Sequence, residues 1–278
     1  MSFLVLLLVV WLEKFSSWRQ RIQRDEPWLR QLAKAEGNSR LVTKPWLTLI
    51  LLVGVPLLGL GVLLWLLQPL AYGWLALPVH LLVLLYSLGR GDLQTALGPF
   101  RDAWRREDGE AALLVAERDM GVVAEDVQTL LTRVQDYVGW QAHQGFFAVI
   151  FWYALLGPLA ALGYRLVALV AERSLHLDMR EHAQQVRHAL DWLPARALAA
   201  SLGLVGNFVA LNRILLPELL NWALPIPRLV GDAFRAAGEC QAPQLGEAGV
   251  TCLNNLWQLL VRAGLFWYAV FALWTLLV

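Results

Sequence analysis

The sequence is poor in cysteine and in charge. It has two cysteines in 278 residues, Cys240 and Cys252, which are too few to form a zinc site alone. Charged residues make up 16% of the chain and leave a net charge of only +1, so nothing suggests a nucleic-acid partner. The two cysteines lie close together in a stretch rich in glycine, proline and glutamine. A disulfide can form there if the stretch faces an oxidising compartment, and the alternative is two free thiols.

The common motifs of nucleotide-binding and hydrolytic enzymes are also missing. The chain has no Walker A sequence, no Rossmann glycine pattern, and no HExxH or GxSxG motif, so spacing alone indicates no catalytic reaction. Three histidines, His176, His182 and His188, are six residues apart. That spacing spreads them around a helix, and we therefore predict no metal site.

Apolar residues are abundant instead. They make up 58% of the chain, above the roughly 45–50% of soluble domains, and they are concentrated in blocks. Many of the 14 tryptophans stand at the ends of these blocks, where an amphipathic ring fits the boundary between membrane and water. The sequence therefore predicts an all-α, polytopic transmembrane protein without a secretory signal peptide.

The blocks predict one membrane domain over residues 1–278. Pro27 is expected to open an amphipathic helix with Trp28, Leu29 and Leu32 on one face. The predicted order is a short apolar helix and interfacial amphipathic helices (1–44), a transmembrane hairpin (46–88), an extramembrane layer of amphipathic helices (90–140), a broken segment, a polar loop and a span (145–216), a mixed loop (217–255), and a last transmembrane helix (256–278).

The segment 145–170 allows two topologies because Gly157-Pro158 interrupts it. It is either one kinked span or a re-entrant pair of half-helices. Basic residues concentrate in 14–44 and 90–140 under both alternatives, so the positive-inside rule places these stretches in the cytoplasm. The side of the C-terminus stays open.

A polar stretch that enters an apolar helix is the first candidate site. Asp191 is expected to cap that helix, with Pro194 near its first turn, and Arg187 and Asp191 are spaced to pair. A purely structural cap is the plain alternative. The functional interpretation is anion binding, because Arg196 and a helix start both favour negative groups.

Other charged residues extend this candidate. The Arg118-Asp119 pair is either a solvated surface pair of little energy or part of the site, and Arg165 ends the broken segment. If that segment is re-entrant, the charged residues can face one cytoplasmic cleft with a net positive charge. The predicted anion cleft consists of Arg118, Asp119, Arg165, His188, Asp191 and Arg196.

Three motifs are Trp11-Leu12-Glu13-Lys14, Phe151-Trp152 before Gly157, and Leu190-Asp191-Trp192-Leu193-Pro194-Ala195-Arg196. They resemble those of the AmpE family, inner-membrane proteins linked to the regulation of β-lactamase induction. The resemblance implies a multi-pass protein of the bacterial inner membrane with a regulatory role in cell-wall sensing. The implied partners are the lipid bilayer and a cell-wall-derived or nucleotide-like anion.

A second set of motifs consists of Gly91-Asp92-Leu93, Arg118-Asp119 and Pro194-Ala195-Arg196. These motifs resemble the CobD/CbiB family, membrane proteins of cobalamin synthesis that form an amide bond in an ATP-dependent step. Most of the family's carboxylates are absent, notably at 168–171 and 187–188, and ATP chemistry needs carboxylates to hold its metal ion. We therefore expect a non-catalytic scaffold without a cofactor. The alternatives are an ATP- and Mg-dependent amide-forming enzyme and a muropeptide transporter.

Overall fold

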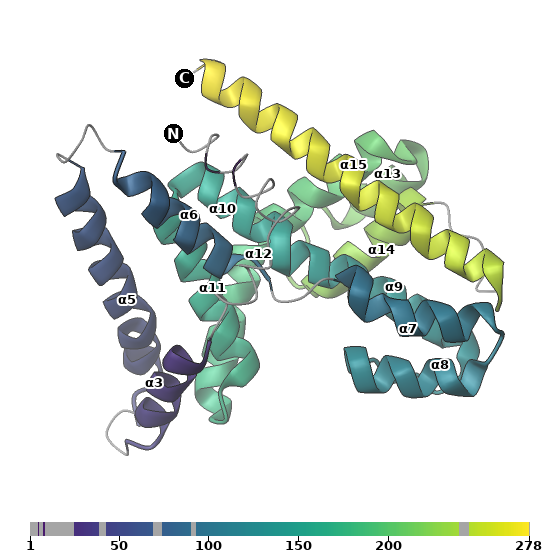
Figure 1. Cartoon of the computed structure of the whole chain (residues 1–278), viewed down its shortest axis with the longest axis horizontal. Coiled ribbons are helices and arrows are strands. Elements are labelled where there is room, and N and C mark those ends of the chain that lie inside the picture. Colours follow the sequence, from purple (N-terminus) through teal and green to yellow (C-terminus); the bar gives the residue numbers. More distant parts are fainter. Residues whose placement is uncertain are drawn as a thin grey trace. The chain divides into compact units, whose positions relative to one another are not determined.

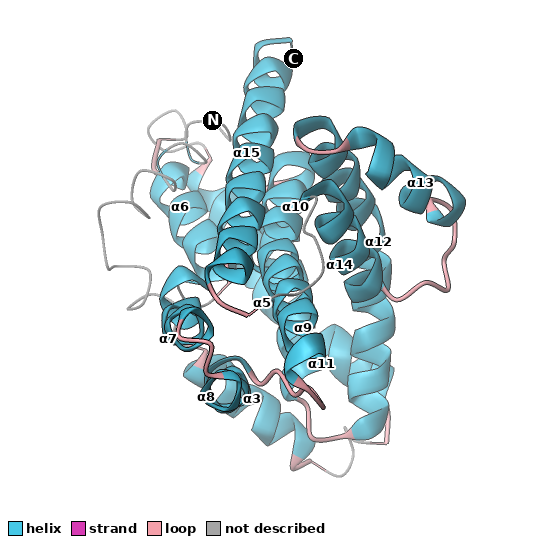
Figure 2. Cartoon of the chain, turned by 90° about the vertical axis from the view of Figure 1, so that its right-hand side faces the viewer, coloured by secondary structure: helices cyan, strands magenta, loops and turns pink. Residues whose placement is uncertain are grey.

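The computed structural model of the chain is all-helical in the part that it describes, namely residues 5, 8, 25–38, 43–68, 74–89, 93–238 and 245–277. Figures 1 and 2 show helices joined by loops in that part, and it contains no strand. The all-α prediction is thus confirmed there. The helices are α3 (Glu26–Glu36), α5 (Pro45–Leu67), α6 (Ala76–Ser87), α7 (Leu93–Arg105), α8 (Gly109–Val115), η2 (Ala116–Met120), α9 (Val127–Ala142), η3 (His143–Phe147), α10 (Ala148–Leu156), α11 (Pro158–Arg173), α12 (Leu177–Val205), α13 (Phe208–Glu218), α14 (Ile226–Gly238) and α15 (Glu247–Leu277), where η2 and η3 are single-turn π-helices.

The chain divides into two compact units that alternate along the sequence. Unit 1 consists of Met1–Arg90 and Ala148–Asp191, and unit 2 consists of Gly91–Phe147 and Trp192–Val278. The long helix α12 therefore contributes its first part to unit 1 and its second part to unit 2. Most of the predicted apolar helix at 3–12 lies outside the described residues.

Helix α11 is the centre of unit 1, where it contacts α5, α6 and α10. Pro27 stands in the first turn of α3, and Trp28 and Leu32 are buried on one face of that helix, as the sequence predicted. These side chains join a hydrophobic core with residues from α5, α11 and α12. Its buried members are Trp28, Leu32, Leu49, Leu166, Leu169, Val170, Ala171, Met179 and Ala183.

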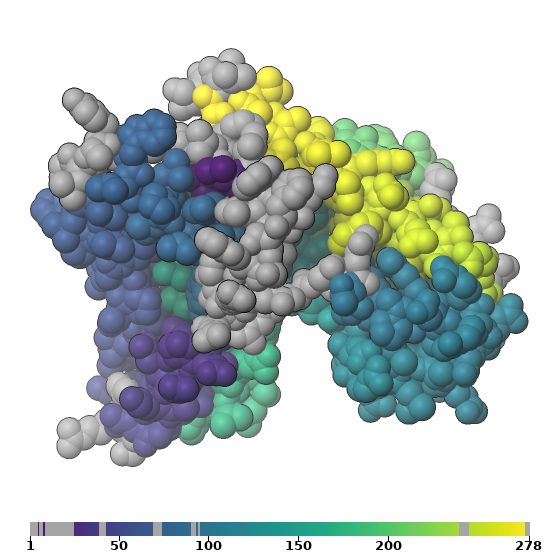
Figure 3. Space-filling model, viewed as in Figure 1, coloured from purple at the N-terminus to yellow at the C-terminus, as the bar shows by residue number. Residues whose placement is uncertain are grey.

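Helix α5 is a long apolar helix with little covering. It has 23 residues and no charged side chain. Only 11% of its most apolar 18-residue stretch is buried. In the space-filling view its blue surface lies open on unit 1 (Figure 3). Among the described helices, α5 and α15 alone have the length and composition to cross a membrane, while α6 is apolar but only 12 residues long.

The predicted interruption at Gly157-Pro158 is confirmed. Gly157 has φ 78° and ψ −163°, a backbone conformation that is favourable only for glycine. Helix α10 ends just before it, and Pro158 opens α11, where its missing N–H does no harm. The two half-helices remain in contact with each other. Whether they re-enter or span a membrane stays a prediction.

The amphipathic helices predicted in unit 2 are present. Leu97, Phe100 and Trp104 of α7 are at most 1% exposed, as are the α9 residues Leu130, Leu131 and Val134. Helix α7 packs against α8 and α15, and α9 packs against α8 and α14. The apolar side chains that recur at helical spacing therefore face a protein core.

Two predictions about α12 were wrong, namely the polar loop before the helix and the position of Pro194 near its first turn. The polar loop expected over 172–189 is mostly helix, because Met179 and Ala183 recur at i and i+4 on a buried face. Helix α12 then continues through Pro194 to Val205. Proline cannot donate to the carbonyl four residues earlier, and that carbonyl, of Leu190, instead accepts the indole N–H of Trp152 at 3.1 Å.

The span predicted up to residue 216 is likewise interrupted. Helix α12 ends at Val205 and α13 starts at Phe208. Between them Asn207 caps α13, since its side-chain oxygen accepts the N–H of Ala210 at 2.9 Å. The 11-residue α13 is too short to cross a bilayer by itself.

The mixed loop predicted over 217–255 contains a buried helix. Pro225 and Pro227 stand at the start of α14, where proline is tolerated. The apolar side chains that follow line the buried face of α14. They are Ile226, Leu229, Val230, Ala233, Phe234 and Ala237. Helix α15 also begins at Glu247, nine residues before the start expected at Leu256.

Candidate functional site

Asp191 is a buried carboxylate inside α12. It is 1% exposed, and the hydroxyl of Tyr164 in α11 donates to its Oδ1 at 2.7 Å. The guanidinium Nε of Arg187 lies 3.4 Å from its Oδ2. The predicted Arg187–Asp191 pair is therefore confirmed, whereas the predicted capping role is wrong because the helix already began at Leu177.

Arg187 connects this carboxylate to a second one. Its Nη1 donates to Oε1 of Glu172 at 3.0 Å. The Arg187 side chain is 11% exposed, that of Asp191 is 2% exposed and that of Glu172 is 36% exposed. The group thus holds one cation and two carboxylates, and its outer member is Glu172. We call Tyr164, Glu172, Arg187 and Asp191 the polar network of unit 1.

Arg165 forms a separate ion pair in unit 1. Its Nη2 lies 3.3 Å from Oδ2 of Asp25, the residue before α3. The two side chains are 13% and 3% exposed, so this pair is largely desolvated. Because Tyr164 and Arg165 are consecutive, one turn of α11 is tied to α12 on one side and to the start of α3 on the other.

The side chain of Arg196 hydrogen-bonds to backbone groups of unit 2. It is 6% exposed and donates to the backbone carbonyls of Trp192, Glu218, Leu219 and Asn221. Its guanidinium also lies 4.1 Å from the Trp192 ring centroid. Three of these carbonyls stand at the end of α13, where a cation also favours the negative end of the helix dipole.

Arg118 and Asp119 form an exposed pair in unit 2. Arg118 donates two hydrogen bonds, of 2.7 and 2.9 Å, to the two oxygens of Asp119. These bonds hold the pKa of the Asp119 carboxyl below its ordinary value. Solvent-exposed pairs of this kind contribute little to stability.

The six residues of the predicted anion cleft are thus divided between the units. Arg165, His188 and Asp191 belong to unit 1, while Arg118, Asp119 and Arg196 belong to unit 2. His188 is half-buried on α12 beside Arg187. A cleft shared by all six stays a prediction. Sequence reasoning missed Asp25, Tyr164 and Glu172, because their partners lie 140, 27 and 15 residues away along the chain.

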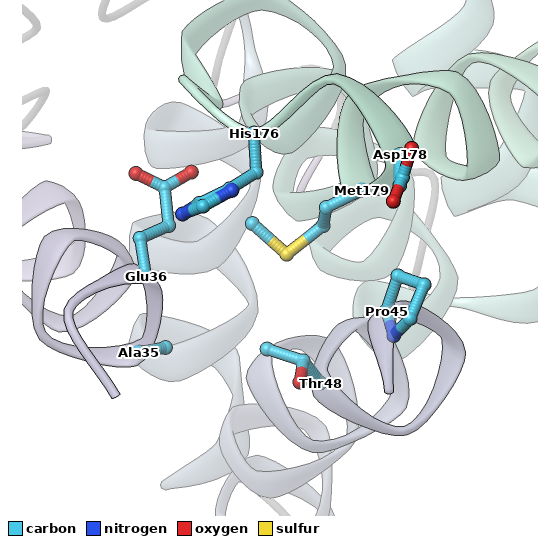
Figure 4. Close-up of a pocket in the computed structure, with 7 residues that line it drawn as sticks. All are labelled: Ala35, Glu36, Pro45, Thr48, His176, Asp178 and Met179. Atoms are coloured by element: carbon cyan, nitrogen blue, oxygen red, sulfur yellow. The ribbon is translucent and has the colours of Figure 1, made fainter. Parts of the chain in front are cut away.

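A small cavity lies where α3, α5 and the start of α12 meet (Figure 4). Glu36 and His176 lie side by side at its edge in Figure 4. Its volume of about 20 Å³ has room for roughly one water molecule. Glu36 is already engaged, since it accepts the hydroxyl of Ser174 at 2.7 Å and the N–H of Leu175 at 3.0 Å. The cavity therefore has no room for a ligand larger than water.

Cys252 on α15 is disulfide-bonded. The side-chain amide of Gln135 on α9 donates to its sulfur at 3.2 Å. Cys240, the chain's other cysteine, lies outside the described residues, so the predicted Cys240–Cys252 bond stays a prediction. In the part of the chain that the structure describes, no three His, Cys, Asp or Glu side chains are grouped to hold a metal ion.

In the part that the structure describes, the chain is all-helical, and two of its helices, α5 and α15, are long and apolar enough to cross a membrane. Residues 1–213 match the family described as "Regulatory signalling modulator protein AmpE", and the chain belongs to this family. It is also similar to "Protein AmpE" of Shigella flexneri, with 27% identity over 170 residues. The alignment covers 56% of this chain and 60% of that protein. No solved structure matches the chain.

Proposed function

We propose that this chain is a multi-pass regulatory protein of the bacterial inner membrane, linked to β-lactamase induction and cell-wall sensing. The AmpE family supports the regulatory role. The observation that carries the membrane location is α5, because an uncharged 23-residue helix with its apolar side chains uncovered is unfavourable in water. Leu58 and Trp65, for example, are each 71% exposed.

The proposed topology follows from the basic residues. Residues 14–44 and 90–140 lie in the cytoplasm, so the chain between them crosses the bilayer twice, outward through α5 and back through the segment that contains α6. Helix α6 packs against α10 and α11. Helix α15 provides a second long apolar segment. A cysteine placed at Gln128 of a C240S/C252S protein should resist membrane-impermeant thiol reagents in intact cells. Ready labelling from outside would reject this orientation.

A role without catalysis is supported by residues 168–171. Where the CobD/CbiB family that this sequence resembles carries polar and acidic residues, this chain has Ala168, Leu169, Val170 and Ala171, each at most 5% exposed. Three of them are members of the hydrophobic core of unit 1. Apolar side chains in a core cannot hold a metal ion or bridge phosphates.

The ligand in this proposal is an anion that binds at the outer edge of the polar network. Glu172 is the most exposed member and already places a carboxylate on Arg187. A phosphate or carboxylate of a cell-wall-derived or nucleotide-like molecule can replace it there. Tyr164 would keep Asp191 in place meanwhile, because the Tyr164–Asp191 bond does not involve Glu172.

Genetic complementation tests this function. A strain without the chain should show altered β-lactamase activity after an inducer is added, and the wild-type gene should restore the response. Glu172→Gln should shift β-lactamase induction to a lower inducer concentration, because the carboxylate that competes with the anion for Arg187 is removed. Adding Arg187→Met to this variant should abolish the shift. Glu125→Gln is the control, since Glu125 is exposed and belongs neither to the polar network nor to the predicted anion cleft. Unchanged induction in the deletion strain would refute the regulatory role.

A further inference from the structure

Unit 2 contains a pocket between α13 and α14 that none of the preceding roles uses. Its volume is about 320 Å³, at the lower end of the range for small-ligand sites. The two helices contact each other, and each contributes one basic and one acidic side chain to the lining. Those residues are Arg213 and Glu218 from α13, and Arg228 and Asp232 from α14.

The two arginines are available to a ligand. Within the described residues, Arg213 forms no ion pair or side-chain hydrogen bond. Arg228 lies 3.8 Å from Asp232, and its side chain is 73% exposed. A long, solvent-exposed pair of this kind is weak, so a phosphate can compete for Arg228. Asp232 keeps a second cation, because Arg235 also donates to it.

The charges of this pocket cancel, and that selects the kind of ligand. Two guanidinium groups face two carboxylates, so a purely anionic ligand would meet Glu218 and Asp232 as well as the arginines. A zwitterion places its negative group on the two arginines and its positive group on the two carboxylates. Charge-assisted hydrogen bonds then form at both ends of the ligand. Glu218 accepts one bond, from the Asn221 amide at 2.6 Å, and a carboxylate has further lone pairs for an ammonium donor.

The surface beside the pocket indicates that the zwitterion belongs to a lipid. Val209, Arg213 and Leu216 follow one another at i, i+4 and i+7, so they share one face of α13. Val209 and Leu216 are 63% and 61% exposed, and Leu220 just beyond the helix is 80% exposed. A basic side chain among exposed apolar ones is typical of a helix in the membrane interface.

We propose that this pocket binds the headgroup of a zwitterionic phospholipid of the phosphatidylethanolamine class. The phosphate lies on Arg213 and Arg228, and the ammonium group lies on Glu218 and Asp232. The exposed apolar side chains of α13 contact the acyl chains. This inference rests on the proposed membrane location, and it adds a lipid selectivity that the regulatory role does not require.

Lipid retention measures that selectivity directly. The full chain is placed in nanodiscs with equal amounts of phosphatidylethanolamine and phosphatidylglycerol, and native mass spectrometry counts the lipids retained on the protein. The wild type should retain mainly phosphatidylethanolamine. Arg213→Ala should lower this retention roughly tenfold, the loss expected for a hydrogen bond to a charged group. Arg133→Ala is the matched control, because Arg133 is an exposed arginine on α9 of the same unit, outside the pocket.

The isosteric variant Glu218→Gln tests the zwitterion specifically. It removes one negative charge, so the lipid ratio should shift from phosphatidylethanolamine toward phosphatidylglycerol while total retention persists. Equal retention of both lipids by the wild type, or equal phosphatidylethanolamine on Arg213→Ala and Arg133→Ala, would overturn the proposal. Binding of soluble glycerophosphoethanolamine as tight as that of the lipid would also overturn it, in favour of a free zwitterion. A chain that does not integrate into membranes would instead refute the proposed function.

Discussion

Trp152 donates its indole N–H to the carbonyl of Leu190 at 3.1 Å, and this bond satisfies the acceptor that Pro194 cannot reach within α12. A proline inside a helix normally disrupts it, since the hydrogen bond to the residue four positions earlier is lost. Here a side chain from α10 replaces the missing backbone donor. The bond joins two residues that are 38 positions apart along the chain, so a side chain of α10 supports α12 at its internal proline.

Trp152→Phe should therefore lower the free energy of unfolding by about 1–3 kcal/mol, the cost of an unsatisfied buried carbonyl. In a Pro194→Ala background the cost should be smaller, because alanine supplies the backbone N–H that Leu190 lacks. Lost packing is common to both backgrounds and cancels in this double-mutant cycle. Thermal unfolding of the four proteins in the same detergent measures the coupling. If the losses of stability were strictly additive, the indole N–H of Trp152 would not be replacing the backbone N–H that is missing at Pro194.

The polar network predicts a contrast between two aspartates. Asp191→Asn removes a buried charge that pairs with Arg187, and the expected loss of stability is on the order of 3 kcal/mol, at the low end for a broken buried ion pair because Arg187 keeps Glu172. Asp119→Asn removes a similar pair on the surface and should leave the unfolding temperature unchanged. Equal effects of the two substitutions would mean that Asp191 is better solvated than its 1% exposure indicates.

Asp126 caps α9 and supplies a pH test. Its side chain accepts the N–H and the hydroxyl of Thr129, each at 2.7 Å, and these bonds keep the pKa of the Asp126 carboxyl below its ordinary value. A carboxyl with a lowered pKa in the folded state stabilises the protein above its unfolded pKa, about 3.9, and loses that contribution as the pH falls through the folded value.

The difference in unfolding temperature between the wild type and Asp126→Asn isolates this residue from the other carboxylates. Asparagine also caps helices but does not titrate. The wild type should be the more stable protein at neutral pH, and its advantage should disappear in acid. A difference that stays constant between pH 7 and pH 2 would rule out the charged cap as its source.

Arg196 supplies a test of the second polar cluster. Its bonds to the carbonyls of Glu218 and Asn221 close the end of α13, so Arg196→Met should increase amide hydrogen exchange throughout that helix. Arg262→Met is the control, because Arg262 is an exposed arginine on α15 of the same unit. Unchanged exchange in Arg196→Met would show that these bonds do not stabilise the end of α13.

Periodicity predicted the elements of this fold better than it predicted their ends. The stripes of Leu97, Phe100 and Trp104 and the interruption at Gly157 are local features, and both are confirmed. The start of α12 was missed because polar side chains on its outer face concealed the buried Met179 and Ala183. Pro225 and Pro227, at the start of α14, suggested a loop, although proline is also common in the first turn of a helix.

The candidate site was harder to predict for a different reason. Arg187–Asp191 is a contact within one helix turn and follows from spacing. Tyr164–Asp191 and Asp25–Arg165 join distant parts of the sequence, and no single-sequence pattern specifies which tyrosine or aspartate is the partner. A buried arginine requires acceptors, which are carboxylates for Arg187 and backbone carbonyls for Arg196. The sequence can therefore indicate that partners exist without identifying them.

The last prediction concerns the environment of α5. Leu58 is 71% exposed on α5, and Leu114 is 68% exposed on α8 of the predicted extramembrane layer. If α5 crosses the bilayer, a lysine near its centre opposes insertion by about 2.5–3.5 kcal/mol, whereas a lysine on a helix in water has little effect. Leu58→Lys should therefore sharply reduce the amount of protein in the membrane fraction, while Leu114→Lys should not.

If α5 were instead a water-exposed helix, both substitutions would be tolerated and Leu58→Lys would improve solubility, because it interrupts an exposed apolar patch. Quantitative blotting of membrane and soluble fractions distinguishes the two results, and it does so with side chains that no predicted ligand site contains.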